Sequence, residues 1–379
     1  MSSTTVSTLL PRDAGERVVA RDLEMIAQQL APELPLLRDA RLLVTGGAGF
    51  LGFYLVQAAA HLNRHHDARL DITVYDSFAR GKPGWLDRLA QEDAVRLVQH
   101  DMRQPLPEDH GRFDWIIHAA SIASPIVYRR DPIGTMDANV NGLRHLLDAA
   151  VAQAREGKPV RGMLFFSSSE IYGDPDAKNI PTDETYRGFV SCTGPRACYD
   201  EAKRYGETLC VNFARQHGVP VKIARPFNNY GPGLGINDGR VIPDFCRDVL
   251  RGRDIVMLSD GSATRTFCYS ADAICGYYKV LVRGGAGESY NVGVESPEIS
   301  MSELASRVGA IGRELVGYRG KVVLGRSDDR DYLVDNPNRR CPIIRKAREQ
   351  VGYDPQVALD DGLRRVFTWY AAQWEGAAS

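Results

Sequence analysis

The sequence predicts an α/β fold, a doubly wound parallel sheet with helices on both faces and a smaller C-terminal lobe. Three observations support this prediction. Short apolar runs typical of buried strands alternate with segments of helical periodicity up to about residue 225. A glycine-rich turn, 46–52, lies directly between the first of these strands and the first long helix. After residue 225 the alternation gives way to an irregular stretch rich in Gly, Pro and Asn, where the smaller lobe is expected to begin.

Six apolar runs are predicted as strands of the sheet. They cover 41–45, 71–76, 95–99, 114–118, 162–167 and 219–225. Helices are expected at about 50–62, 139–152 and 199–216. Residues 266–285 return to a helical pattern, and two further helices are expected at 302–316 and near the C-terminus. Strands that alternate with helices in this way are joined by crossovers, and they therefore run parallel.

The chain before the first strand is predicted to be an extension with one helix. Residues 1–19 are polar and are expected to be loose. Apolar residues then recur at helical spacing, and Pro32 and Pro35 end the helix, which gives the range 22–34. The predicted division of the chain is 1–39 for the extension, 40–225 for the main domain, which 266–290 rejoin, and 226–379 mainly for the smaller lobe.

Composition excludes several classes of protein. In a chain of 379 residues, 47 Lys and Arg nearly balance 48 Asp and Glu, so no general field favours nucleic acid or an acidic membrane. No apolar run reaches the roughly 18 residues that a membrane helix needs. The N-terminus lacks the basic start and apolar core of a secretory signal. The seven cysteines form no CxxC pair, which favours reduced thiols. We therefore expect a cytoplasmic protein without a metal, a nucleic-acid partner or a membrane anchor.

The glycine-rich turn has the features of a dinucleotide site. Gly46, Gly49 and Gly52 permit a tight turn, close approach of the backbone to a pyrophosphate, and close packing of helix on strand. Phe50 and Leu51 begin the following helix, whose free N–H groups and positive dipole end favour phosphates. The turn therefore predicts a Rossmann-type site for a dinucleotide cofactor.

Acidic residues at the ends of the next two strands indicate which cofactor binds. Asp76 ends the second strand, where a carboxylate bonds the adenosine ribose hydroxyls and repels the extra phosphate of NADP. NAD is therefore expected, although Arg80 and Lys82 follow closely and can offset the repulsion. Asp101, just past the third strand, is expected near the adenine, with a surface turn residue as the alternative.

A tyrosine, a lysine and a serine are candidates for the redox chemistry. Tyr199 and Lys203 are four residues apart on a predicted helix, so both side chains lie on one face. A tyrosine with its ordinary pKa of about 10 is a weak base at neutral pH, and a neighbouring ammonium group favours the phenolate. The same lysine can hold the nicotinamide ribose. Ser168, at the end of the fifth strand, can hydrogen-bond the hydroxyl that is oxidised.

With these motifs in place, residues 40–370 resemble the extended short-chain dehydrogenase/reductase family, which includes nucleotide-sugar epimerases and dehydratases. Within this family they are most similar to the UDP-glucuronate decarboxylase (UDP-xylose synthase) branch. The similarity is carried by SSSEIYGDP (167–175), GPRACYDEAKRYGET (194–208), NDGRVIPDF (237–245) and GSATRTFCYSAD (261–272). The GPRxCYDExKR pattern is specific to that branch, whereas the glycine turn and Tyr-xxx-Lys mark only the superfamily.

The resemblance implies roles for further residues. Glu170 takes the position of a carboxylate near sugar C5, and Arg265 that of an arginine that reaches the sugar and the diphosphate. Asn228 and Arg340 match residues at the phosphates of the nucleotide sugar.

The chain also departs from related patterns. The 4,6-dehydratases usually carry Asp-Glu where this chain has Ser169-Glu170, which removes the acid that would protonate a departing C6 hydroxyl. Compared with the decarboxylase pattern, Ala202 stands at a glycine, Gly233 at an arginine and Ile343 at an aspartate. The identity of the sugar is therefore the open point.

The resemblance implies NAD-dependent oxidation at C4 of a nucleotide sugar. For UDP-glucuronate, loss of carbon dioxide would follow, and the product would be UDP-xylose or a UDP-4-keto-pentose. A C4 epimerase or a 4,6-dehydratase acting on a related nucleotide sugar is the alternative, and a non-catalytic NAD-binding sensor is a third interpretation. The resemblance also implies a homodimer that pairs through the long helices beside the redox residues.

Overall fold

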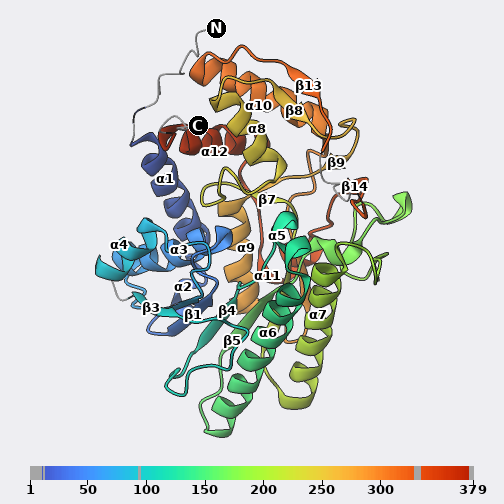
Figure 1. The fold of residues 1–379 in the computed structure, drawn as a ribbon. Coiled ribbons are helices and arrows are strands. Elements are labelled where there is room, and N and C mark those ends of the chain that lie inside the picture. The colour runs from blue at the N-terminus through green and yellow to red at the C-terminus, as the bar shows by residue number, and fades with distance from the viewer. Residues whose placement is uncertain (1–10, 12, 93–94, 328–333, 375–379) are drawn as a thin grey trace.

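A computed structural model describes residues 11, 13–92, 95–327 and 334–374 of the chain (Figure 1). Its centre is a seven-stranded parallel sheet with the order β11–β6–β5–β4–β1–β2–β3. The strands are β1 (Arg41–Thr45), β2 (Asp71–Asp76), β3 (Val95–Gln99), β4 (Trp115–His118), β5 (Gly162–Phe166), β6 (Val221–Pro226) and β11 (Ser289–Val292). The predicted fold class, a doubly wound parallel sheet, is confirmed.

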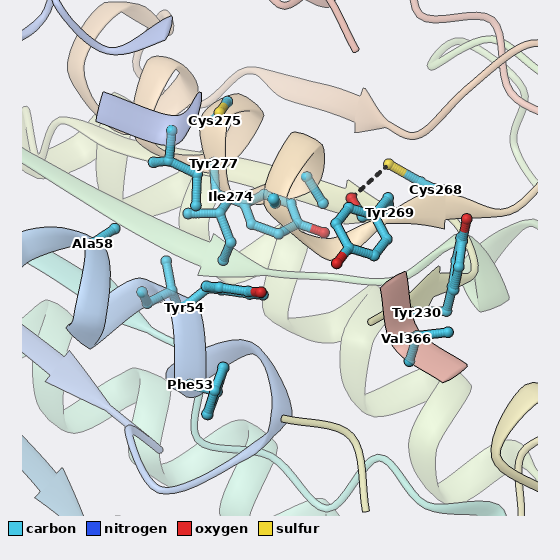
Figure 2. Close-up of a cluster of buried hydrophobic side chains, with 14 of the residues drawn as sticks. Phe53, Tyr54, Ala58, Tyr230, Cys268, Tyr269, Ile274, Cys275, Tyr277 and Val366 are labelled. Carbon is cyan, nitrogen blue, oxygen red and sulfur yellow. Dashed lines mark hydrogen bonds between the residues drawn. The ribbon is translucent and has the colours of Figure 1, made fainter. Parts of the chain in front are cut away.

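Helices bury both faces of this sheet. On one face lie α3 (Phe50–His66) and α9 (Ser270–Arg283), and on the other lie α6 (Pro132–Arg155) and α7 (Ala197–His217). Side chains alternate across a strand, so Leu42 and Val44 lie in one hydrophobic core and Leu43 lies in the other. Figure 2 shows part of the first core, where Tyr54 and Ala58 of α3 face residues of α9. Two covered faces explain why the strands are apolar throughout rather than alternating with polar residues.

The predicted strands and helices of the main domain are confirmed, with differences at their ends. The sixth strand begins at Val221 rather than at 219. The seventh, β11, was not predicted, and it pairs with β6 after α9 has returned the chain to the sheet. Helix α6 begins well before 139, because Asp131 caps it by accepting a hydrogen bond from the amide of Gly134.

The predicted N-terminal extension has a different structure from the one expected. Helix α1 spans Ala14–Gln29 and is followed by a short helix α2 (Leu34–Leu37), so the prediction of one helix over 22–34 is wrong. Residues 1–10 and 12 of the stretch expected to be loose lie outside the described residues, whereas 14–19 belong to α1. The reason is tertiary: α1 contacts α3, α9 and α12 (Leu359–Ala372), which stabilise a helix longer than its apolar spacing indicates.

A buried carboxylate fixes α1 to these three helices. Asp22 is fully buried and accepts hydrogen bonds from the hydroxyls of Tyr54 at 2.5 Å and Tyr269 at 2.6 Å. It also pairs with Arg365 of α12 at 2.7 Å. Both tyrosines lie in the cluster drawn in Figure 2. A buried charge is tolerated only when it is paired and hydrogen-bonded, so this arrangement holds α1 in one position.

The C-terminal part adds small elements around the carboxyl ends of the main sheet. Helices α8 (Val241–Leu250), α10 (Met301–Val316) and α12 contact one another at the top of Figure 1. Three small sheets have the orders β12–β9–β14, β10–β7 and β13–β8. Their strands are β7 (Asn229–Tyr230), β8 (Ile255–Met257), β9 (Thr264–Arg265), β10 (Cys268–Tyr269), β12 (Ile299–Ser300), β13 (Val322–Leu324) and β14 (Arg339–Arg340). The remaining helices are α4 (Gly84–Glu92), α5 (Pro125–Arg130) and α11 (Arg345–Val351). The division into a main domain and a lobe at residue 225 stays a prediction.

Among the described helices, none combines the length and the apolar character that a membrane span requires.

Candidate active site

The glycine turn has the backbone geometry that a dinucleotide requires. Gly46 has φ +73°, and a Cβ there would lie 2.6 Å from the backbone of Ala120. A Cβ on Gly52 would lie 2.3 Å from the carbonyl oxygen of Gly47, so α3 could not pack this close to the turn. Gly49 is the N-cap of α3, and no side chain caps the N–H groups at Phe50 and Leu51. The helix N-terminus is therefore open to a phosphate, as predicted.

Asp76 lies at the end of β2 and holds the turn. One of its carboxylate oxygens accepts a hydrogen bond from the amide of Ala48 at 3.0 Å, and the other from the amide of Phe78 at 2.8 Å. The two cations that could offset its charge are engaged elsewhere. Arg80 lies 3.6 Å from Asp238, and Lys82 lies 2.7 Å from Asp87. This arrangement keeps the negative charge that disfavours a ribose phosphate beside the turn.

Asp101 is less suited to a cofactor contact than Asp76. Its carboxylate pairs with the guanidinium of Arg103 at 2.5 Å and also accepts the amide of that residue. The pair holds the pKa of Asp101 below its usual range. The contact with adenine that the sequence suggested remains a prediction. The contacts that Asp101 makes with Arg103 are those of a residue in a surface turn.

The three redox candidates lie together at the carboxyl end of β5. Tyr199 and Lys203 are both buried on α7, and Ser168 follows the strand. The Nζ of Lys203 donates to the carbonyl of Phe166 at 2.8 Å and lies 5.5 Å from the centroid of the Tyr199 ring. The spacing of four residues therefore brings the pair onto one face, as expected.

The electrostatics of this pair differ from the expectation. Burial raises the pKa of Tyr199 to about 12, although a hydrogen bond with Ser168 opposes the shift. Burial also lowers the pKa of Lys203 to about 7. The ammonium effect predicted from the sequence is therefore outweighed by desolvation. The protein alone does not make Tyr199 a strong base.

A second tyrosine, which sequence reasoning missed, stacks on Tyr199. The ring of Tyr128 from α5 lies 5.4 Å from that of Tyr199 at an interplanar angle of 12°. Its hydroxyl is buried and has no hydrogen-bond partner in the described part of the chain. An unpaired buried hydroxyl is unfavourable, so a polar group of a bound molecule is its natural partner. No motif marks Tyr128, because its place beside Tyr199 depends on how α5 packs against α7.

Glu170 lies between two arginines. It belongs to a single 3-10 turn, Ser169–Tyr172, directly after β5. Arg340 binds its carboxylate in a bidentate manner, with one contact of 2.5 Å, and Arg196 donates to the same group. Burial alone would raise the pKa of Glu170, but the two arginines outweigh burial and lower it. Glu170 is therefore an ionised carboxylate at neutral pH.

Arg196 also connects Glu170 to a further buried acid. Its Nε lies 3.6 Å from the carboxylate of Asp200, the residue that follows Tyr199. Burial and the nearby charge of Glu170 raise the pKa of Asp200. Both residues fall inside the GPRACYDEAKR motif, which was used for the resemblance, but neither was assigned a role. The signal was present and was not interpreted.

The contacts of Arg265 and Arg340 with the sugar and the phosphates, which the resemblance implies, stay predictions. Strands β9 and β14 pair these two arginines side by side. The guanidinium of Arg265 donates to the carbonyls of Thr264 at 2.7 Å, Asn338 at 3.0 Å and Pro337. It is Arg340, expected at the phosphates, whose guanidinium bonds Glu170. Arg265 therefore adds a second positive charge near the Glu170–Arg340 pair.

Asn228 has a structural partner. Its side-chain amide donates to the carbonyl of Thr266 at 2.9 Å, and its own backbone has φ +42°. This bond ties β7 to the segment between β9 and β10. A phosphate oxygen accepts hydrogen bonds, so the expected phosphate contact would have to use the second N–H of this amide, and it stays a prediction.

One of the departures from the decarboxylase pattern, Gly233, has a local cause. Gly233 has φ +90°, and a Cβ there would lie 2.4 Å from the Cβ of Phe53, so an arginine does not fit in this conformation. Ile343 contributes its backbone, donating to the carbonyl of Thr182 at 2.8 Å and accepting the amide of Asn291 at 3.1 Å. Ala202 is buried in α7, and nothing in the structure explains the loss of a glycine there.

Comparison with known proteins places these features in context. Residues 42–293 match the NAD dependent epimerase/dehydratase family. The chain is 36% identical over 325 residues to UDP-glucuronic acid decarboxylase 6 of Arabidopsis thaliana, with 86% of this chain and 87% of that protein covered. It is 34% identical over 362 residues to UDP-glucuronic acid decarboxylase 1 of Xenopus tropicalis, with 95% and 79% covered.

Solved structures agree with these sequence matches. A dTDP-glucose 4,6-dehydratase from Streptomyces venezuelae with NAD bound has a TM-score of 0.73 and 28% identity, covering 88% of this chain and 98% of the other. A UDP-glucuronic acid 4-epimerase from Bacillus cereus, at 23% identity, has a TM-score of 0.72 and covers 88% and 99%. The latter supports the fold alone. Together the comparisons confirm the predicted resemblance, the enzyme class and NAD as the cofactor.

Proposed function

Because the chain belongs to the NAD-dependent epimerase/dehydratase family, we propose that it decarboxylates UDP-glucuronate. One observation carries this proposal: Glu170 is held as an ionised carboxylate by Arg196 and Arg340, close to the redox candidates. The curated relatives at 34–36% identity, which are named UDP-glucuronic acid decarboxylases, support the same substrate.

The proposed reaction begins with oxidation at C4 of the sugar. Tyr199 accepts the proton of the C4 hydroxyl, which Ser168 orients. NAD, when bound at the glycine turn, supplies the hydride acceptor and a positively charged ring that favours the phenolate. This charge matters because burial, the largest influence, raises the pKa of Tyr199 to about 12. Lys203 would hold the nicotinamide ribose when NAD is bound.

Oxidation at C4 makes the substrate a β-keto acid, which can lose carbon dioxide because the ketone accepts the electron pair. Arg340 and Arg265 add positive charge beside the developing enolate. An ionised Glu170 cannot donate a proton itself, so we propose that it orients a water molecule that protonates C5. The hydride taken from C4 would then return to the ketone, which gives UDP-xylose and restores NAD; if the ketone leaves first, the products are a UDP-4-keto-pentose and NADH.

Ser169 argues against dehydration as the main reaction. Its buried side chain occupies the position where 4,6-dehydratases usually carry an aspartate. A serine hydroxyl is a far weaker acid than a carboxyl group, and the neighbouring Glu170 is ionised. Neither group can protonate a departing C6 hydroxyl. A C4 epimerase remains the alternative, because it needs the same oxidation at C4.

A panel of nucleotide sugars tests the proposal. Incubation with UDP-glucuronate, UDP-glucose and UDP-N-acetylglucosamine, followed by mass spectrometry, should show turnover of UDP-glucuronate alone. Its product should be lighter by one carbon dioxide, or by one carbon dioxide and two hydrogen atoms if the 4-keto-pentose is released. Turnover of a neutral nucleotide sugar without reaction of UDP-glucuronate would contradict both the decarboxylase and the uronate epimerase.

The cofactor preference gives a second expected result. By calorimetry, NAD should bind at least about tenfold more tightly than NADP, because Asp76 repels the extra phosphate. Arg80→Ala should leave this preference unchanged, since its guanidinium lies at Asp238 rather than at Asp76. Equal or tighter binding of NADP would show that Asp76 does not face the ribose.

We also propose that the enzyme is a homodimer paired through α6 and α7. These helices lie side by side on one face of the sheet, and Ile133 and Met136 of α6 expose 68% and 42% of their surface. Exposed apolar side chains on a long helix favour a protein contact. Light scattering at micromolar concentration should give twice the chain mass of 41.9 kDa. A monomer under these conditions would contradict the proposed dimer.

We propose that the enzyme works in a reducing compartment such as the cytoplasm. All seven cysteines are free, and five of them are buried. Buried reduced thiols are typical of proteins that never meet an oxidising environment.

A further inference from the structure

A group of metal-ligand side chains lies outside the active site, where α1 meets α3. Glu24 comes from α1, and His61 and His66 come from α3. One ligand atom from each of the three lies within 4.8 Å of the other two. No metal ligand was predicted from the sequence, because the glutamate and the histidines are distant in the chain and meet only in the folded protein.

The distances within this group suit a small transition-metal ion. The Nε2 of His61 lies 3.4 Å from the carboxylate of Glu24. Tetrahedral zinc with bonds of roughly 2.0–2.1 Å places its ligand atoms about 3.4 Å apart. The first two ligands therefore already have the right separation. His66 lies near the C-terminal end of α3 and is only half-buried. Its ligand nitrogen has to move closer to the other two ligand atoms when a metal binds.

The histidine nitrogens lack other partners. In the described part of the chain, Nε2 of His61 and Nε2 of His66 are shielded from solvent and make no hydrogen bond. Shielded polar atoms without a partner are rare in proteins and require an explanation. The second oxygen of Glu24 accepts a hydrogen bond from Gln28 at 2.9 Å, which orients the carboxylate as outer-shell partners of metal ligands do.

We propose that Glu24, His61 and His66 form a binding site for a divalent transition metal such as Zn²⁺, with a fourth position open to water. Imidazole nitrogens bind zinc, copper and nickel well. Magnesium and calcium prefer oxygen ligands, so two histidines disfavour them. The site joins the N-terminal helix to the helix that begins at the glycine turn. Asp22 connects the same two helices through Tyr54. The metal would therefore stabilise the position of α1, and this inference does not rest on the proposed reaction.

Titration calorimetry of tag-free protein, stripped with EDTA and desalted, tests the site with zinc chloride as the probe. One equivalent of zinc should bind per chain, and magnesium chloride should give no binding. His61→Gln and His66→Gln should each weaken zinc binding by at least tenfold, as should Glu24→Gln. Zinc should also raise the melting temperature of the unmodified protein, because the metal binds only the folded chain. This rise should be lost in the three variants.

Two histidines serve as matched controls. His65 is the neighbour of His66 on α3 and is exposed; its ring centroid lies 4.5 Å from that of His61 with the rings tilted by 43°, but it is outside the group of three. His217 is exposed at the end of α7. His65→Gln and His217→Gln should bind zinc as the unmodified protein does. Melting curves without zinc show whether each variant folds. Absence of saturable zinc binding, or unchanged affinity in His61→Gln and His66→Gln, would overturn the proposal.

Discussion

Replacing Tyr199 by phenylalanine is expected to lower kcat on UDP-glucuronate by roughly 100- to 10,000-fold while the fold and NAD binding persist. The change removes one hydroxyl and keeps the ring that stacks on Tyr128. That hydroxyl hydrogen-bonds Ser168 and is the proposed acceptor of the C4 proton, so its removal takes away the proposed base. The rate is measured by formation of the UDP-linked product, and NAD binding by calorimetry.

Tyr205→Phe is the matched control for this experiment. Tyr205 lies on the same helix, α7, but half of its surface is exposed, whereas Tyr199 is buried. Its variant should retain the rate of the unmodified enzyme. A Tyr199→Phe enzyme with near wild-type turnover would remove Tyr199 from the mechanism.

Arg340→Lys should reduce decarboxylation by about 100-fold, a loss typical for removal of a preorganised charged donor. Lysine keeps the positive charge, but it cannot reproduce the bidentate contact with Glu170. Glu170 would then retain Arg196 as its main partner and lose its fixed orientation. Product formation from UDP-glucuronate measures the effect, with a melting curve to show that the fold is kept.

The adjacent arginine provides the control. Arg339 pairs with Glu298 on the other side of β14, with contacts of 2.7 and 2.9 Å. Because this pair does not include Glu170, Arg339→Lys should change the rate little. If Arg340→Lys were as active as Arg339→Lys, Arg340 would have no special role at the site.

The sequence predicted those parts of the fold that local patterns determine. Apart from the edge strand β3, which is partly exposed, the strands from β1 to β6 are largely buried, so they appear as apolar runs between turn residues. β11 was missed because its four residues, SYNV, carry too little pattern to stand out. The start of α1 was missed for another reason. Its position depends on Asp22 and on contacts with α12, more than 300 residues away in the chain.

The candidate site was also predictable only where local patterns determine it. Tyr199 and Lys203 are four residues apart on one helix, so their meeting follows from helical geometry. The pairing of Glu170 with Arg340 spans 170 residues and depends on the register of β14 against β9. Family resemblance pointed to both residues, but it placed Arg340 at the phosphates and did not pair it with Glu170. Only the folded structure shows which of the two adjacent arginines reaches the carboxylate.

The fate of the sugar carboxylate tests the central claim most directly. UDP-glucuronate labelled with ¹³C at C6 is incubated with the enzyme and NAD in D₂O, and both the gas and the nucleotide product are followed. The proposed mechanism predicts release of ¹³C-labelled carbon dioxide and a UDP-pentose, or its 4-keto form, that carries deuterium at C5. Retention of the label in UDP-galacturonate, with every carbon kept, would contradict the decarboxylase and support a C4 epimerase.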